Sequence, residues 1–150
     1  MKRILALDLG DKRIGIAVSD QQCIIAQPVG FIKRTNLRND IGALKNHIDS
    51  FKANKVIVGL PKSLNGSIGP RAKLVLEFTQ RLKEELEQEI IVWDERFTTS
   101  QAEKVLIQGN VKRRKRKSLV DKLAAVLILQ SYLDYLAENY LNEQISKETK

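Results

Sequence analysis

The stretch Ile4-Leu-Ala-Leu-Asp8-Leu-Gly10-Asp11-Lys12-Arg13-Ile14-Gly15-Ile-Ala-Val-Ser19 decides the fold. Two apolar runs are joined by a short polar turn, a pattern that predicts a β-hairpin at the start of a sheet. Asp8 stands near the end of the first run, where a buried strand favours Val or Ile. Gly10 follows it, and its missing side chain would let another molecule come close. Asp8 is therefore a candidate for chemistry, whereas Asp11 is predicted to be a turn residue.

Strand-like and helix-like patterns alternate after the hairpin. Residues 24–32 are predicted to form a third strand, in which Pro28 suits an edge position or a bulge. Apolar residues then recur at three- and four-residue steps over about 36–51, which predicts a helix. A second such helix lies between 55–60 and 90–93, two short apolar runs that are typical of strands covered on both faces. The pattern indicates an α/β protein.

Two carboxylates from distant parts of the chain are expected at one edge of this sheet. Strand–helix–strand crossovers make the strands at 55–60 and 90–93 parallel to each other. If both also run parallel to the first strand, the carboxyl ends of all three lie on one edge, where open α/β sheets bind ligands. Asp8 ends the first strand and Glu95 follows the last. Strand alternation decides whether Asp94 or Glu95 faces the edge, and the sequence leaves this open.

A third acid, Asp121, begins a long helix predicted from Ser118 to about Tyr140. Its spacing from Ser118 would let it cap the helix. It also heads an apolar stripe of mostly small residues that suits close packing on the sheet: Ala124, Ala125 and Ile128. An acid in this place points toward the sheet, where an ionised carboxylate is costly unless a metal or another cation meets it. Three acids at one edge would form a hard-oxygen site for two Mg²⁺ or Mn²⁺ ions.

Six consecutive cations, residues 112–117, separate this helix from a short helix that is predicted to open at Ser100. We expect the run to be a solvated loop, and a basic arm of this kind commonly grips phosphates. The net charge of +8 likewise points to a polyanionic partner.

Composition limits the chemistry that is open to this chain. With 150 residues, of which 43% are hydrophobic, we expect one domain over 1–141 and a flexible polar tail over 142–150. The single Cys23 and the single His47 exclude an internal disulfide, a cysteine zinc site and a two-histidine metal site. Hydrolysis would therefore need carboxylates and metal ions. The chain has no apolar run of membrane-span length and no secretory leader, so we expect no membrane contact and a cytoplasmic protein.

Four sequence blocks resemble, in order, those of the YqgF/RuvX family: ALDLGDKRIGIAVSD, VGLPKSLNGSIGPRA, VWDERFTTSQAEKVL and KSLVDKLAAVLILQSYL. The resemblance covers residues 3 to about 136. The family belongs to the ribonuclease H-like superfamily, and its members are described as Holliday junction resolvases and as nucleases that mature the 5′ end of pre-16S ribosomal RNA. The resemblance implies a ribonuclease H-like fold. This is a five-stranded mixed sheet with helices on both faces, in which the first three strands are antiparallel and the last two are parallel to the first. It also implies that Asp8, Glu95 and Asp121 bind the metal and catalyse the reaction.

Several cations lie on segments that lead off the same edge, and they are candidates for phosphate contacts, which give affinity without sequence preference. They are Lys12, Arg13, Lys62, Arg71, Arg96, Lys112, Arg113, Arg114, Lys115, Arg116 and Lys117. The expected partners are precursor ribosomal RNA or branched DNA, with ribosomal particles as a further candidate, for a monomer or a homodimer.

We therefore expect a metal-dependent endonuclease that acts on precursor ribosomal RNA. The same chemistry on four-way DNA junctions would need paired cuts and a dimer. The pattern Asp8-x-Gly10-x-x-x-x-Gly15 also resembles the phosphate-binding hairpin of the actin, hexokinase and heat-shock ATPase superfamily. Those proteins bind nucleotide between two lobes, and this chain has length for only one. In a further alternative, the protein is a non-catalytic RNA-binding module with structural acids.

Overall fold

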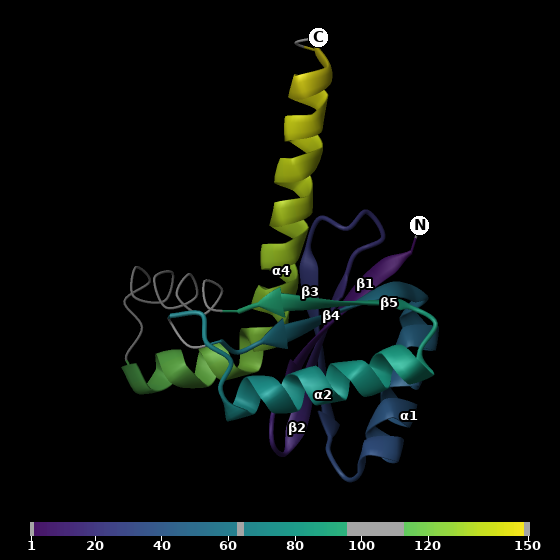
Figure 1. Ribbon diagram of the computed structural model, residues 1–150, viewed down its shortest axis with the longest axis vertical. Coiled ribbons are helices and arrows are strands. Elements are labelled where there is room, and N and C mark those ends of the chain that lie inside the picture. Colours follow the sequence, from purple (N-terminus) through teal and green to yellow (C-terminus); the bar gives the residue numbers. More distant parts are fainter. Residues whose placement is uncertain (1, 63–64, 96–112, 149–150) are drawn as a thin grey trace.

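The protein forms a single five-stranded mixed sheet with strand order β3-β2-β1-β4-β5 (Figure 1). The computed structural model describes residues 2–62, 65–95 and 113–148, with side chains from Leu123 onward in the last range. The strands are β1 (Arg3–Leu9), β2 (Arg13–Ser19), β3 (Ala26–Lys33), β4 (Ala53–Leu60) and β5 (Glu89–Asp94). The pairs β1–β2 and β2–β3 are antiparallel, whereas β1–β4 and β4–β5 are parallel. The predicted topology is thereby confirmed.

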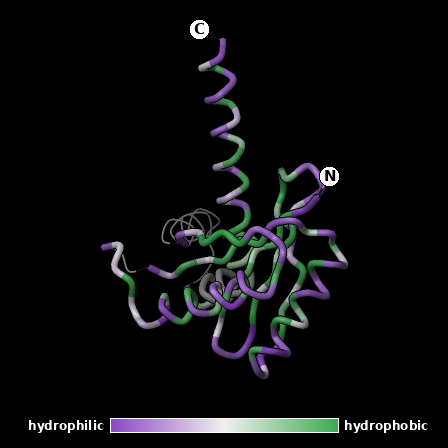
Figure 2. The backbone as a smooth tube through the Cα atoms, turned by 45° about the vertical axis from the view of Figure 1, so that its right-hand side comes forward, coloured by the Kyte–Doolittle hydropathy of each residue, from purple (hydrophilic) through white to green (hydrophobic). Residues whose placement is uncertain are grey.

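Helices cover both faces of the sheet, as predicted. Helices α1 (Leu37–Phe51) and α2 (Pro70–Glu85) lie on one face, and the long helix α4 (Arg113–Glu148) crosses the other (Figure 1). Asn36 caps α1 by accepting a hydrogen bond from the Asn39 N–H at 2.9 Å, and Pro70 occupies the first turn of α2, where its missing N–H costs nothing. Figure 2 shows hydrophobic residues concentrated in the central strands.

The two faces differ in the size of their side chains. The face under α1 and α2 carries branched residues such as Leu5, Leu7 and Val58. The face under α4 carries small residues, among them Ala6 and Ala17. Because successive side chains of a strand alternate between faces, this difference follows from the order of residues in each strand. Small residues let α4 approach the sheet closely.

Pro28 lies in an edge strand beside a bulge, as its sequence position predicted. The register between β2 and β3 shifts between Ile16, which pairs with Gly30, and Ala17, which pairs with Pro28. Gly30 has φ +136°, a conformation that residues with a Cβ rarely adopt. An edge strand has one row of N–H groups without a neighbouring strand, so it tolerates proline.

The prediction that residues 112–117 form a loop is wrong for the five cations from Arg113 to Lys117, because α4 begins at Arg113. Lys and Arg have high helix propensity, and no Gly or Pro interrupts the run. The helix also continues to Glu148 instead of ending near Tyr140, and its last turns project beyond the sheet (Figure 1). Residues 142–148 are therefore helical, while the domain limit at 141 and the flexibility of the tail stay predictions. The helix predicted from Ser100 and the cation Lys112 lie outside the described residues.

Within the described ranges, no helix combines the length and the hydropathy needed to cross a membrane.

Candidate active site

Asp8 lies on the α4 face of the sheet, near the carboxyl end of β1. It pairs in register with Gly15 of β2. A Cβ added to Gly15 would lie 3.6 Å from the Cβ of Asp8 and 3.7 Å from the Cβ of Ala125 in α4. Asp8 is half-buried. The glycine thus leaves room for α4 to pack directly beside the acid.

Glu95 extends over the neighbouring part of the same face. Its backbone N–H donates a hydrogen bond of 3.2 Å to the carbonyl oxygen of Leu60, which holds the chain against β4 as it leaves β5. Its Oε2 atom lies where a Cβ of Gly59 would be, and the same Cβ would come within 2.5 Å of Cδ1 of Ile128. A side chain at residue 59 would therefore have to displace the end of the Glu95 or the Ile128 side chain. The glycine in an otherwise apolar strand was the sequence signal for this close approach, and sequence reasoning missed it.

The structure places Glu95, rather than Asp94, on the face that carries Asp8. Ile91 and Trp93 of β5 pack into the core under α4, whereas Val92 packs into the core on the other face. Glu95 continues the alternation of Ile91 and Trp93. The indole N–H of Trp93 donates to the hydroxyl of Ser131 in α4 at 3.2 Å, so this ring is part of the core.

The electrostatics of Glu95 show that the two acids lie close together. Burial raises the pKa of Glu95 from 4.5 to about 7, and the negative charge of Asp8 is the next largest cause. The charge of Asp94 raises this pKa further, and the guanidinium of Arg71 lowers it. Two carboxylates that repel each other in a partly desolvated place favour a cation between them. Arg71 follows Pro70 at the start of α2, so the structure brings this predicted cation within electrostatic reach of the acids.

The direction of α4 carries position 121 toward the same edge. Ala125 packs beside Asp8. Further along the helix, Gln130 accepts a hydrogen bond of 2.9 Å from the N–H of Ala26, which pairs with Ser19 where β2 ends, at the other end of the strands from Asp8. The helix therefore runs away from the Asp8 edge after residue 125, and Asp121 precedes Ala125 by four residues, about 6 Å along the axis. The side chain of Asp121 is outside the described part. Among the side chains that the structure describes, no three His, Cys, Asp or Glu residues form a metal-binding group.

The hairpin that leads off Asp8 is held by Arg34, which sequence reasoning did not single out. Its Nη1 donates to the carbonyl oxygen of Gly10 at 2.8 Å, and its backbone N–H donates to that of Lys12 at 2.9 Å. Its Nε lies 3.4 Å from Oδ2 of Asp40, which is only 2% exposed. A Cβ on Gly10 would lie 2.7 Å from the carbonyl oxygen of Arg13. The place that a Gly10 side chain would take is thus filled by the hairpin itself, which gives this glycine a structural reason. That another molecule comes close to Gly10 stays a prediction.

The remaining predicted cations are only partly located. Arg13 shares the face of Gly15 on β2, and its guanidinium lies 4.4 Å from the ring centroid of Phe31. Lys62 follows β4 directly, and its N–H donates to the Leu60 carbonyl at 3.1 Å. The backbone of 113–117 forms the first turns of α4. Arg96 lies outside the described residues.

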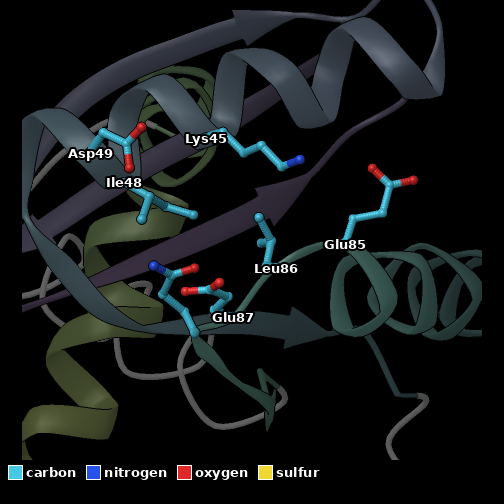
Figure 3. Close-up of a pocket in the computed structure, with 7 residues that line it drawn as sticks. Lys45, Ile48, Asp49, Glu85, Leu86 and Glu87 are labelled. Carbon is cyan, nitrogen blue, oxygen red and sulfur yellow. The ribbon is translucent and has the colours of Figure 1, made fainter.

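A cavity at the opposite edge of the sheet is separate from these acids. It has a volume of about 260 Å³ and lies where α1 and α2 end (Figure 3). Side chains of both helices and of the segment before β5 line it: Lys45, Ile48, Asp49, Glu85, Leu86, Glu87 and Gln88. Because β1 and β4 begin at this edge, the cavity lies at the far end of the strands from Asp8 and Glu95.

Comparisons with known proteins agree with this fold and show the family to which the chain belongs. The RuvX family model, described as Holliday junction resolvase, matches residues 2–135. A relative from Clostridium tetani named "putative pre-16S rRNA nuclease" is 52% identical over 132 residues, which cover 88% of this chain and 96% of that protein. A relative of the same name from Caldanaerobacter subterraneus is 49% identical over 133 residues, with 88% and 96% covered.

Two solved structures share the fold at low sequence identity. The RuvC protein of T. thermophilus, solved with a Holliday junction substrate, has a TM-score of 0.62 at 12% identity, with 93% of this chain and 97% of that chain covered. The yeast mitochondrial Holliday junction resolvase Ydc2 has a TM-score of 0.61 at 12% identity, with 99% and 85% covered. The fold is ribonuclease H-like, as the sequence resemblance implied.

Proposed function

This chain belongs to the RuvX family, and on that premise we propose that it is a metal-dependent endonuclease that matures the 5′ end of pre-16S ribosomal RNA in the cytoplasm. The observation that carries the proposal is the pairing of Asp8 with Glu95 on one face of the sheet, where the first acid raises the pKa of the second. The name shared by the relatives supports the choice of substrate. Family membership argues against the nucleotide-binding alternative.

The acids suit a hard divalent cation. Carboxylate oxygens are the ligands that Mg²⁺ and Mn²⁺ prefer, and a cation would relieve the repulsion between Asp8 and Glu95. We propose that Asp8, Glu95 and Asp121 hold two such ions. When bound, these ions supply the Lewis acid that activates water and stabilises the leaving oxygen of a phosphodiester.

The protein's own residues position the substrate around these acids. Arg71 lies near Glu95, so it is placed to contact the phosphate that is cut. Lys12, Arg13 and Lys62 would contact phosphates along the edge, as would Arg96 and the cations of 112–117. Such contacts fix the position of the backbone but carry no sequence information. The partners we propose are precursor ribosomal RNA and the ribosomal particles that contain it, bound by a monomer or a homodimer.

The test is cleavage of a precursor 16S fragment with its 5′ extension, in the presence of Mg²⁺ or Mn²⁺. We expect wild-type protein to cut within the 5′ extension, and Asp8→Asn and Glu95→Gln to bind the fragment without cutting it. Asp11→Asn is the matched control, because Asp11 is an exposed acid of the same hairpin. Equal cleavage by Asp8→Asn and wild type would refute the proposal. A wild type that binds the fragment and never cuts it would favour the RNA-binding module.

Resolution of four-way DNA junctions is the second candidate function. The family description and the fold shared with RuvC favour it. Labelled junctions and precursor RNA should therefore be offered side by side. Symmetric cuts in the junction by a dimer, with the RNA left intact, would reverse our order of preference.

A further inference from the structure

We propose that Phe31 and Arg13 form a stacking platform for an unpaired nucleobase next to the phosphate that is cut. The location relative to the cut rests on the proposed function, whereas the binding site itself does not. The platform consists of the ring of Phe31 on β3 and the guanidinium of Arg13 on β2.

The platform lies in one row with the acid Asp8. Phe31 pairs in register with Gly15, and Gly15 pairs with Asp8, so the three residues cross three adjacent strands. Cε1 of Phe31 and Cβ of Asp8 both lie within 3.7 Å of the place that a Cβ of Gly15 would take. Two strand spacings separate the backbones of Phe31 and Asp8, about 10 Å. Gly15 itself has no side chain, and the Cβ of Ala125 in α4 lies within the same 3.7 Å, so the ring, the acid and the helix meet over this glycine.

Phe31 is unusually accessible for an aromatic residue in a sheet. It is 46% exposed and belongs to neither of the core clusters formed by the described residues. Its ring is nevertheless held in place, because the guanidinium of Arg13 lies 4.4 Å from its centroid. An exposed ring beside a planar cation is the combination that binds bases, because both groups stack on π-faces.

This geometry selects for the state of the nucleic acid. A base inside a duplex has both of its faces covered by neighbours, so only an unpaired base can reach Phe31. Stacking tolerates any base, and the platform should therefore discriminate by strandedness rather than by sequence. The substrate class that follows is a nucleic acid with an unpaired nucleotide within one or two positions of the cut.

The test compares two RNA oligonucleotides of equal length, each with a 2-aminopurine base. One is single-stranded, and the other is a blunt hairpin closed by a polyethylene glycol linker in place of a nucleotide loop, so that it has no unpaired base. We expect binding of the wild-type protein to quench the 2-aminopurine fluorescence of the single strand. Phe31→Leu keeps an apolar side chain without a π-face, and it should lose the quenching and bind the single strand about tenfold more weakly. Phe31→Tyr should restore both. Tyr140→Leu is the matched control, because Tyr140 is an aromatic residue of α4 that is 62% exposed.

Several results would overturn the platform. Unchanged binding and quenching in Phe31→Leu would overturn it. A loss of affinity for the hairpin equal to that for the single strand would also overturn it, as would a wild type that binds neither oligonucleotide. A melting curve checks that the variant folds. Should Phe31→Leu unfold, Phe31→Met serves in its place, because Met is also apolar and without a π-face, and a several-fold loss is expected for the single strand alone. Quenching without any cleavage of precursor RNA would refute the proposed function and leave the platform standing, and cleavage without quenching would do the reverse.

Discussion

The carboxylate of Glu95 occupies the space above Gly59 that a side chain at residue 59 would fill. The glycine lies near the carboxyl end of β4, directly beside β5, whose end carries the acid. The position of Glu95 is therefore set by the absence of a methyl group on another strand. Four predictions test this arrangement and its surroundings.

Gly59→Ala should displace the carboxylate of Glu95 or the side chain of Ile128, because both lie within contact of the new Cβ. We expect cleavage of the precursor fragment to fall about 100-fold, since a displacement of about 1 Å in an active site costs this much. Overpacking should also lower the free energy of unfolding by about 1–3 kcal/mol.

The matched control for this variant is Gly42→Ala. A Cβ on Gly42 in α1 would meet nothing within 4 Å, so this change should leave cleavage unaltered and stabilise the helix by about 0.5–1 kcal/mol. Rates of cleavage and urea unfolding curves measure both effects. Full activity in Gly59→Ala would show that residue 59 does not set the position of Glu95.

Glu95→Gln should stabilise the metal-free protein at high pH. Folded Glu95 keeps its proton up to about pH 7, whereas the unfolded chain loses it near 4.5. The folded state binds more protons between these values, so the free energy of unfolding falls as the pH rises from about 4.5 to about 7. At pH 8 the free energy of unfolding of the variant should exceed that of the wild type by up to about 3 kcal/mol, and at pH 4 the two free energies should be equal. Urea unfolding in EDTA from pH 4 to pH 8 measures this difference. A difference in unfolding free energy that is the same at all pH values would contradict the raised pKa of Glu95.

Mg²⁺ or Mn²⁺ should raise the melting temperature of the wild type more at pH 8 than at pH 5. The cation competes with the proton on Glu95, whose pKa of about 7 keeps the acid neutral at pH 5. At 100 times the dissociation constant, a ligand stabilises the folded state by about 2.7 kcal/mol. Differential scanning calorimetry with and without the ion measures the shift. Asp8→Asn should remove it, and a shift of equal size in Asp8→Asn would place the ion elsewhere.

Arg34→Ala should loosen the hairpin that follows Asp8. The change removes a donor to the Gly10 carbonyl and leaves the buried carboxylate of Asp40 without its cation. Leaving a buried acceptor without one of its partners costs about 1–3 kcal/mol, and Asp40 keeps its hydrogen bond from the Thr35 N–H. Hydrogen exchange of the amides of 10–13 should accelerate together with this loss.

Arg81→Ala is the matched control for Arg34→Ala. Arg81 pairs with Glu84 and Glu85 on the exposed side of α2, so its removal should cost less than about 1 kcal/mol. Equal costs for the two arginine variants in urea unfolding would show that Arg34 is an ordinary surface cation.

The topology of the sheet was readable from local patterns. The polar turn after Leu9 predicted the hairpin, and the apolar runs within β4 and β5 predicted that these two strands are parallel to each other. Their direction relative to β1 and the helices on both faces came from the family resemblance. These features depend on periodicity and on the handedness of crossovers, which a single sequence displays. Pro28 indicated the edge strand, because proline has no backbone N–H to donate to a neighbouring strand.

The length of α4 was not readable in this way. Its cations from Arg113 to Lys117 suggested a solvated loop, because like charges repel. The charges of Lys and Arg lie at the ends of long side chains, however, so the backbone keeps their high helix propensity. The charges therefore determine the surface of this segment but not the conformation of its backbone.

The sequence, through its crossovers and its resemblance to the family, predicted that Asp8 and one of the two acids at the end of β5 reach the same edge, because parallel strands that alternate with helices end on one side of a sheet. Only the tertiary structure decided that the acid is Glu95, whose carboxylate fills the space that the missing side chain of Gly59 leaves. It also decided that Arg34 and Asp40 hold the neighbouring hairpin. Local patterns report the order and the faces of strands. Contacts between residues tens of positions apart depend on how those faces meet, and this information exists only in the folded chain.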